Sequence, residues 1–323
     1  MKTLVIGDLH IREEEPFYST SLQFLDWIKY LVESKDRIIL LGDVFHRSKP
    51  SPPENTLFSS FIDWCFLNSV TLTVLQGNHD YSEHHKYFST DLFKDKILII
   101  DRPSLEKFDK HNFLFLPWIP KGDLQDYKSL KDFYENEIFF ENESSKKTYL
   151  MYHFPDETVE FGGNTGINLS RFEDQFKDVI RLGGDIHINR YKNYVGTPYP
   201  TRYDERNQNG QIFSINERGD LEKLDTPIFL QYKDVDYKNL NKLLEFNDEV
   251  KKILTIDNAP SKLVEEEINY PNVWIRKINL ESSIERTVSS ETSMKKNIKE
   301  VFTEFSTINK IDDSTKSYIL EKL

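Results

Sequence analysis

The chain has 323 residues, of which 38% are hydrophobic and 13% aromatic, and this composition excludes an intrinsically disordered protein. Its 54 acidic and 42 basic side chains give a formal net charge of −12, which argues against a nucleic-acid-binding protein whose affinity comes from Lys and Arg alone. The single cysteine, Cys65, excludes a disulfide framework, and its apolar neighbours predict a buried thiol.

The sequence gives no sign of a membrane segment or a signal peptide. No run approaches the roughly 18 consecutive apolar residues that a membrane helix needs. The apolar stretch at the N-terminus is short and leads directly into Asp8 and His10. We therefore expect a protein of the reducing cytoplasm, or of the host cytoplasm if the source is a phage.

Strands and helices are predicted to alternate in the first third of the chain. The short apolar runs at 4–6, 37–41 and 71–75 predict buried strands. The apolar spacing over 22–32 and 58–66 predicts two helices between them. This order implies right-handed crossovers and parallel pairing of the three strands.

Three more strands are predicted at 112–116, 148–152 and 179–182. Between the first two of these, residues 121–147 are polar and charged and predict a helix and a surface loop. Polar side chains stand just after the carboxyl ends of most predicted strands. In open α/β sheets that edge is where ligands bind.

The character of the sequence changes near residue 226. Strand-like runs at 228–232 and 273–278 flank a charge-rich segment with helical character, and beyond it an amphipathic pattern predicts one or two helices. We therefore divide the chain into a large domain over 1–225, a small α+β cap domain over 226–282 and a helical tail over 283–323.

The strand ends carry a set of side chains that bind divalent metal ions. In chain order they are Asp8, His10, Asp43, His46, Asn78, His79, His153, Asp185 and His187. Carboxylate, imidazole and amide oxygen suit ions such as Mn, Fe or Zn, and the lack of thiolates argues against a structural zinc site. The set is large enough for two ions that share one carboxylate, an arrangement that clamps a phosphate.

Each of these motifs also has a simpler interpretation. An Asp after a strand-end Gly often caps a helix or forms a turn, but five such motifs in one order favour the metal site. Arg47 and Lys49 flank the second motif. They are candidates for contacting a substrate phosphate, and an exposed loop without that role explains them equally well.

The motifs resemble those of the calcineurin-like metallophosphoesterase superfamily. They read Gly7-Asp-x-His10, Gly42-Asp-x-x-His46, Gly77-Asn-His-Asp80, a lone His153 and Gly184-x-x-His187. A narrower resemblance, to SbcD-type double-strand-break repair exonucleases of bacteria and phages, is carried by Gly42–His46 with Pro50-Ser-Pro52, Leu116-Pro-Trp118 and Gly196-Thr-Pro198. The resemblance covers about residues 1–215. It implies an α/β fold, a two-sheet metallophosphoesterase sandwich flanked by helices, with the small cap domain and helical tail appended.

The resemblance also implies a role for each motif residue. The ligands would be Asp8, His10, Asp43 and His187 for a first ion, with Asp43 bridging to a second ion held by Asn78, His153 and Asp185. His79 would contact the phosphate and stabilise charge in the transition state. His46 would position the phosphate or protonate the leaving oxygen. The implied cofactors are two divalent metal ions, Mn above all.

One position departs from the family pattern. The last motif usually reads Gly-His-x-His, whereas this chain has Gly184-Asp-Ile-His187. A carboxylate at position 185 can still bind an ion and favours Mn or Mg over softer metals. Its negative charge should lower the Lewis acidity of the second ion.

The function implied is an Mn-dependent DNA nuclease, an exonuclease on duplex ends and an endonuclease on single strands, that acts in recombination and repair. Such nucleases bind an SbcC-like ABC-type coiled-coil ATPase through a C-terminal segment, and the resemblance also allows a homodimer. Two alternatives stay open. A phosphatase or cyclic-nucleotide phosphodiesterase could share the fold, because the metal site does not fix the substrate. Asp185 and the acidic composition also fit a non-catalytic assembly scaffold.

Overall fold

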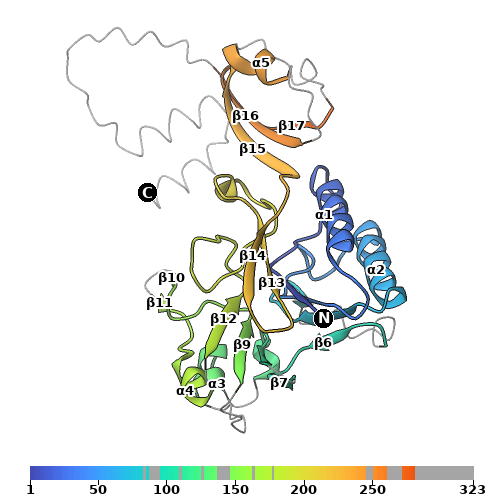
Figure 1. Cartoon of the computed structure of the whole chain (residues 1–323). Coiled ribbons are helices and arrows are strands. Elements are labelled where there is room, and N and C mark those ends of the chain that lie inside the picture. Colours follow the sequence, from blue (N-terminus) through green and yellow to red (C-terminus); the bar gives the residue numbers. More distant parts are fainter. Residues whose placement is uncertain are drawn as a thin grey trace, which may run out of the picture. The chain divides into compact units, whose positions relative to one another are not determined.

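The structure is a computed structural model of the whole chain (Figure 1). The residues it describes are 1–82, 85–86, 95–108, 111–124, 127–136, 146–161, 164–176, 178–244, 250–259 and 271–280. Within them, no helix is both long and apolar enough to span a membrane. The predicted tail over 283–323 lies outside the described residues.

Two β-sheets form the centre of the fold. The first has the strand order β14-β13-β1-β2-β3-β6 and the second β12-β9-β8-β7. The bounds in the first sheet are β1 Thr3–Ile6, β2 Arg37–Leu40, β3 Thr71–Leu75, β6 Leu98–Ile100, β13 Gln211–Ile215 and β14 Leu221–Asp225. Those in the second are β7 Ser104–Lys107, β8 His111–Leu116, β9 Lys147–Tyr152 and β12 Val179–Gly183. Strands β1, β2 and β3 pair in parallel, which confirms the predicted pairing, and β6, which we did not predict, pairs in parallel with β3.

Alternation along the strands assigns side chains to two different cores. On β1, Leu4 and Ile6 face outward to a cluster under two helices, whereas Val5 joins the cluster between the sheets. On β8, Phe113 and Phe115 reach into that same inter-sheet cluster. Successive side chains of a strand point to opposite faces, so the two sheets are packed against each other through this shared core.

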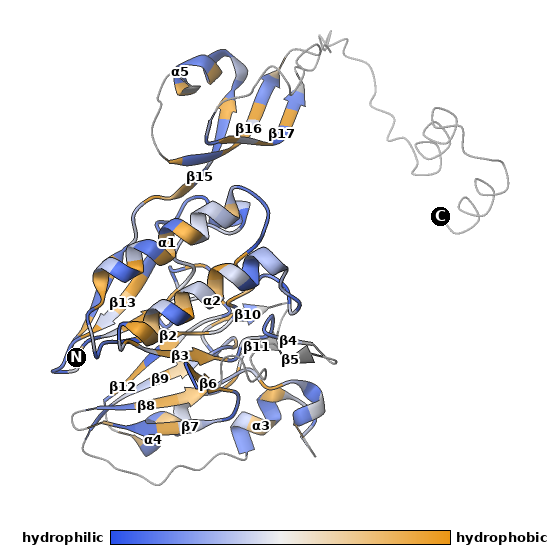
Figure 2. Cartoon of the chain, turned by 90° about the vertical axis from the view of Figure 1, so that its right-hand side faces the viewer, coloured by the Kyte–Doolittle hydropathy of each residue, from blue (hydrophilic) through white to orange (hydrophobic). Residues whose placement is uncertain are grey.

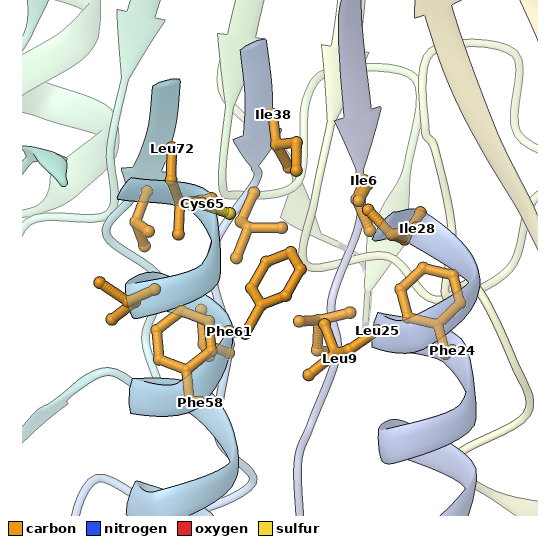
Figure 3. Packing of buried hydrophobic residues seen from close by; sticks show 14 of the residues in the cluster. Ile6, Leu9, Phe24, Leu25, Ile28, Ile38, Phe58, Phe61, Cys65 and Leu72 are labelled. Atoms are coloured by element: carbon orange, nitrogen blue, oxygen red, sulfur yellow. The ribbon is translucent and has the colours of Figure 1, made fainter. Parts of the chain in front are cut away.

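Helices cover the outer face of the first sheet. They are α1, Phe17–Leu31, and α2, Pro52–Leu67, whose buried side chains meet Ile6, Ile38 and Leu72 of the sheet (Figure 3). Helix α2 begins with a capping box in which the Ser51 side chain accepts from the Glu54 N–H and the Glu54 carboxylate accepts from the Ser51 N–H.

Three side chains of these helices test the sequence predictions. Cys65 is a buried free thiol, as predicted, and burial raises its pKa to about 12. The predicted apolar stripes include Leu22 and Phe66, but these side chains are 41% and 54% exposed. The predicted helices are correct, but these two side chains lie on the exposed face and not in the core. In α1 the buried face includes Phe24 and Leu25.

Shorter helices cover the second sheet. They are α3, Leu130–Asn136, and α4, Ser170–Gln175 (Figure 2). Tyr134 and Phe172 of these helices pack with Leu114 and Leu150 of the sheet. Helices, two sheets and helices thus form four layers, which confirms the predicted two-sheet sandwich. The remaining short elements are β4 Tyr81–Ser82, β5 His85–Lys86, β10 Glu160–Phe161, β11 Asn164–Thr165 and the turns η2 Lys121–Asp123 and η3 Tyr203–Glu205.

Beyond residue 226 the chain forms a separate parallel sheet in the order β15-β16-β17. Its elements are β15 Leu230–Asp236, η4 Tyr237–Asn239, α5 Leu240–Leu244, β16 Lys251–Ala259 and β17 Val273–Leu280. Leu254 and Ile256 of the central strand lie in a hydrophobic cluster of this segment. Helix α5 confirms helical sequence between the two predicted strands, whereas β16 is a strand that we did not predict. The division of the chain at residue 226 stays a prediction.

Candidate metal centre

Strand ends of both sheets deliver the candidate ligands to one place. Asp8 and His10 follow β1, Asp43 follows β2, and Asn78 and His79 follow β3. From the second sheet, His153 follows β9, and Asp185 and His187 follow β12. The chain therefore uses the carboxyl ends of parallel strands, as predicted.

The loops that carry these residues are held in a strained backbone conformation. After β1 and β2 the chain continues as a paired segment, with the N–H of His10 donating to the carbonyl of Asp43 at 3.0 Å. The φ angles are 46° at His10, 49° at Asp43 and 70° at Asp185. Left-handed backbone is uncommon for residues other than glycine and gathers at functional sites.

Glycines in the motifs make room for the side chains. At Gly42, with φ of 103°, an added Cβ would lie 2.4 Å from Nδ1 of His153. At Gly77 it would lie 2.3 Å from Oδ1 of Asp43. Any side chain at either position would collide with the centre, so the Gly-Asp and Gly-Asn pairs are a steric requirement of the site.

One group of ligand atoms is formed by Asp8, His10 and His187. Their donor atoms all lie within 4.8 Å of one another. Nε2 of His187 is 2.9 Å from Nε2 of His10 and 3.6 Å from Oδ2 of Asp8. Asp43 adjoins this group, because its Oδ2 is 3.7 Å from Nε2 of His10. The structure therefore brings the four predicted ligands of the first ion together.

A second group surrounds His153. Its Nε2 lies 3.3 Å from Oδ1 of Asp43 and 3.0 Å from the side-chain amide of Asn78. Asp43 thus lies between the two groups, where a bridging ligand is expected. The N–H of Asp185 donates to Oδ1 of Asp8 at 3.3 Å, and the Asp185 carboxylate interacts electrostatically with His153 and His187.

Hydrogen bonds orient three of the imidazole rings. The Nδ1 of His153 donates to the carbonyl of Leu41. The Nδ1 of His187 donates to the carboxylate of Glu205 at 2.5 Å, and the Nδ1 of His79 donates to the carbonyl of His46 at 2.6 Å. An acceptor oxygen holds the proton on Nδ1, so that Nε2 keeps its lone pair for the centre. In His153 and His187 this is the tautomer that metal binding needs.

Burial and close charges shift the pKa values of the site. Burial raises the pKa of Asp8 to about 7 and also raises that of Asp185. Burial lowers the pKa of His10 well below its ordinary value. Nδ1 of His10 is also buried without a hydrogen-bond partner among the described residues. Burial lowers the pKa values of His153 and His187, but the hydrogen bonds and charges of neighbouring carboxylates raise them above the ordinary value. Buried carboxylates and imidazoles that converge in this way fit divalent metal ions.

His46 lies closer to the centre than the resemblance implied. Its ligand atom is within 4.8 Å of those of His10 and His79, and its ring stacks on His79 with centroids 5.8 Å apart. Burial, and then the charge of Arg12, lower its pKa to about 4. His46 is therefore neutral near pH 7 and within reach of an ion.

The two candidate substrate contacts lie on the exposed loop that follows Asp43. Arg47 forms an ion pair with Glu14 at 2.9 Å, and both side chains are at least half exposed. Lys49 is exposed as well. This placement agrees with a plain exposed loop and leaves their contact with a substrate a prediction.

Two carboxylates that support the centre were not assigned a role from the sequence. Asp80 is buried and accepts from the N–H groups of Asp43, Val44 and Gly77 at 2.9, 3.1 and 2.9 Å. It closes the Gly-Asn-His-Asp motif, so its position in that motif was the available signal. Glu205, the partner of His187, lies in an ordinary turn and carries no such signal.

These features define a phosphoesterase, and the chain belongs to the calcineurin-like phosphoesterase family, which it matches over residues 1–189. Membership of this family supports a metal-dependent phosphoesterase activity for the chain. The SbcD subunit of the nuclease SbcCD from Escherichia coli (strain K12) is 34% identical over 87 residues, 25% of this chain and 21% of that protein. UDP-2,3-diacylglucosamine hydrolase of Psychromonas ingrahamii is 27% identical over 128 residues, 34% of this chain and 51% of that protein. The chain thus spans about a fifth and about half of the lengths of these relatives.

Proposed function

We propose that the chain is an Mn-dependent DNA nuclease that degrades duplex ends and cuts single strands. The observation that carries the proposal is the buried group of Asp8, His10, Asp43, His153 and His187. Similarity to a component of a nuclease over 87 residues supports DNA as the substrate. The proposal extends that likeness from a quarter of the chain to the whole protein.

Two ions would be held by the residues that already converge. Asp8, His10, Asp43 and His187 would bind one, and Asp43, Asn78, His153 and Asp185 the other. When bound, such ions polarise the phosphate and lower the pKa of water. Oxygen and nitrogen ligands without sulfur suit Mn, which the resemblance to SbcD-type nucleases implies.

The chain's own residues would orient the phosphodiester. His79 is fixed through Nδ1, and its side chain is 37% exposed, so Nε2 would be within reach of a phosphate oxygen. A donor aimed at developing charge is a large catalytic contribution. His46, neutral beside it, would position the phosphate.

The acidic chain should need help to hold a long DNA molecule, because affinity for the phosphate backbone depends on basic side chains. We propose that an SbcC-like ABC-type ATPase supplies that surface and binds the predicted tail over 283–323. The two proteins would act together in recombination and repair. Co-purification of the ATPase with the full chain, and its loss when residues 283–323 are removed, would support this partner.

The test is cleavage of labelled DNA by the purified full chain. Linear duplex and single-stranded circles are incubated with Mn, with and without an SbcC-type ATPase. We expect metal-dependent products from both substrates, abolished by Asp8→Ala and retained by Asp174→Asn, an exposed control in α4. Intact DNA under all these conditions would overturn the proposal.

A second candidate follows from the other relative. Similarity to a UDP-2,3-diacylglucosamine hydrolase favours a phosphoesterase that acts on a small nucleotide-linked molecule, and a phosphatase or cyclic-nucleotide phosphodiesterase belongs to the same group. Comparing kcat/KM for a chromogenic phosphomonoester, a phosphodiester and a cyclic nucleotide separates these from a nuclease. A scaffold without activity would bind fewer than two ions at saturating Mn and would hydrolyse none of these three substrates.

A further inference from the structure

A hollow of about 390 Å³ opens beside the candidate metal centre. Asn78 and Asp185, both candidate ligands, line one part of it. Trp118, Phe154 and Ile167 provide apolar wall. The hollow lies where β3, β8, β9 and β12 end, so it is continuous with the centre and has the volume of a small-molecule site.

Trp118 is held rigidly with respect to the ligand loop. Its N–H donates to the carbonyl of Gln76 at 2.9 Å, and the Gln76 side-chain amide donates to its carbonyl at 2.8 Å. Gln76 stands two residues before Asn78. Trp118 is partly exposed, whereas Pro117 and Ile119 on either side are buried. The backbone of Trp118 is thus fixed, and its indole, whose centroid is 6.1 Å from that of the Tyr81 ring, is an aromatic surface that solvent or a ligand can reach.

The part of the wall formed by Phe154 is also firm. Phe154 directly follows the candidate ligand His153 and is 2% exposed. Its ring packs against those of Tyr134 and Tyr152, with centroids 4.9 and 5.3 Å away. Buried rings in a packed cluster do not need to reorganise when a ligand arrives, which favours binding.

We propose that this hollow binds the nucleobase of the nucleotide next to the scissile phosphate, stacked on Trp118. The inference rests on the proposed nuclease function and specifies its substrate. A base has flat apolar faces, as the wall requires, and every base can stack on an aromatic ring. The net charge of −12 makes stacking valuable, because phosphate contacts alone would be weak.

A base inside a duplex cannot enter such a hollow, because it is paired and stacked. The substrate class is therefore DNA with an unpaired nucleotide at the cleavage position, at a frayed end or in a single strand. The other occupant that an apolar wall could take is an acyl chain. That occupant is an outcome of the binding experiment below.

Binding is measured first, on the metal-free full chain with adenosine as the probe, by saturation-transfer NMR. We expect wild type and Trp118→Phe to bind adenosine, and Trp118→Ala to bind about tenfold more weakly. Trp64→Ala, which removes a partly exposed tryptophan of α2, should leave binding unchanged. Equal adenosine binding by Trp118→Ala and wild type would overturn the base site. Binding of a fatty acid at Trp118, with no binding of adenosine, would overturn it as well.

Cleavage is measured second, on single-stranded oligonucleotides with one abasic residue. With Mn, wild type and Trp118→Phe should cut beside the abasic residue about tenfold more slowly than beside a normal nucleotide. Trp118→Ala should cut both at one slow rate. Equal rates in wild type would overturn the base site and leave the nuclease function standing. If wild type cuts no DNA at all, the nuclease function fails, and the adenosine experiment still decides the site.

Discussion

Glu205 and His187 share a buried hydrogen bond of 2.5 Å between Oε1 and Nδ1. The same carboxylate accepts from the N–H groups of Thr201 at 2.6 Å and Arg202 at 3.2 Å. Burial raises the pKa of Glu205, but the hydrogen bond and charge of His187, together with the N–H groups of Thr201 and Arg202, bring it below its ordinary value, so it stays ionised. An anchored carboxylate behind a ligand histidine fixes the ring and raises its basicity.

Replacing Glu205 should therefore weaken metal binding without touching a ligand. We expect Glu205→Gln to lower the affinity for Mn by about 10- to 100-fold, because the neutral amide no longer stabilises the ring that donates Nε2. Isothermal titration with Mn measures this change. Asp204→Asn, an exposed neighbour in the same turn, is the control and should bind as wild type does. Equal affinities for the two variants would contradict a role for Glu205.

Asp185 allows a test of the second ion. The backbone at this residue has φ of 70°, a region that His and Asn tolerate better than most side chains. We expect Asp185→Ala to bind about one ion fewer than wild type and Asp185→His, which restores the family pattern, to bind the full complement. Elemental analysis after dialysis against Mn counts the ions. An unchanged count in Asp185→Ala would show that Asp185 is no ligand.

The sequence predicted the centre because its ligands obey a local rule. Each of Asp8, Asp43, Asn78 and His153 directly follows an apolar strand or its terminal glycine, so position along the chain implied position at the sheet edge. Glu205 follows no strand. Its contact with His187 depends on how the intervening turns fold back, and that path has no periodic signal.

Similar limits apply to the fold. Strands β1, β2 and β3 are apolar runs buried on both faces, which the sequence displays directly. Strand β16 opens with Lys251 and Lys252 and carries Asp257 and Asn258 just before its last residue, Ala259. These polar residues hide its short apolar centre, and its pairing with β15 and β17 connects segments that are distant in sequence.

His79 is predicted to act on the phosphate and not on the metal. Its Nδ1 is bound to the carbonyl of His46, and its Nε2 lies 3.9 Å from Asp43. We expect His79→Ala to lower kcat by about 100- to 1,000-fold, the effect of removing a donor to developing charge. Its content of Mn should equal that of wild type. His10→Ala, by contrast, should lose metal and activity together. Loss of Mn from His79→Ala would reassign that residue as a ligand.

Asp156 forms a buried polar network away from the metal centre. Its carboxylate accepts from Tyr152 at 2.8 Å and Asn193 at 3.1 Å, and Arg181 lies 3.4 Å away. Burial raises the pKa of Asp156, but the hydrogen bonds from Thr158, Tyr152 and Asn193 together bring it below the ordinary 3.8. All of these partners donate hydrogen bonds to the carboxylate. A protonated carboxyl or an amide at this position would place a second donor against them and is therefore unfavourable.

This network gives stability a defined dependence on pH. A carboxyl with a lower pKa folded than unfolded stabilises the fold above its unfolded pKa, and that contribution disappears as pH falls through the folded pKa. At pH 7 we expect Asp156→Asn to lower the free energy of unfolding by about 1–3 kcal/mol, because an amide presents N–H groups to donors. The difference from wild type should shrink below about pH 4, where the wild-type carboxyl begins to be protonated. Its O–H, like the N–H groups of the amide, then faces the surrounding donors. Urea unfolding across this pH range measures it, with Asp174→Asn as the exposed control. A difference that stays constant down to about pH 2 would show that the charge of Asp156 is not what stabilises the fold.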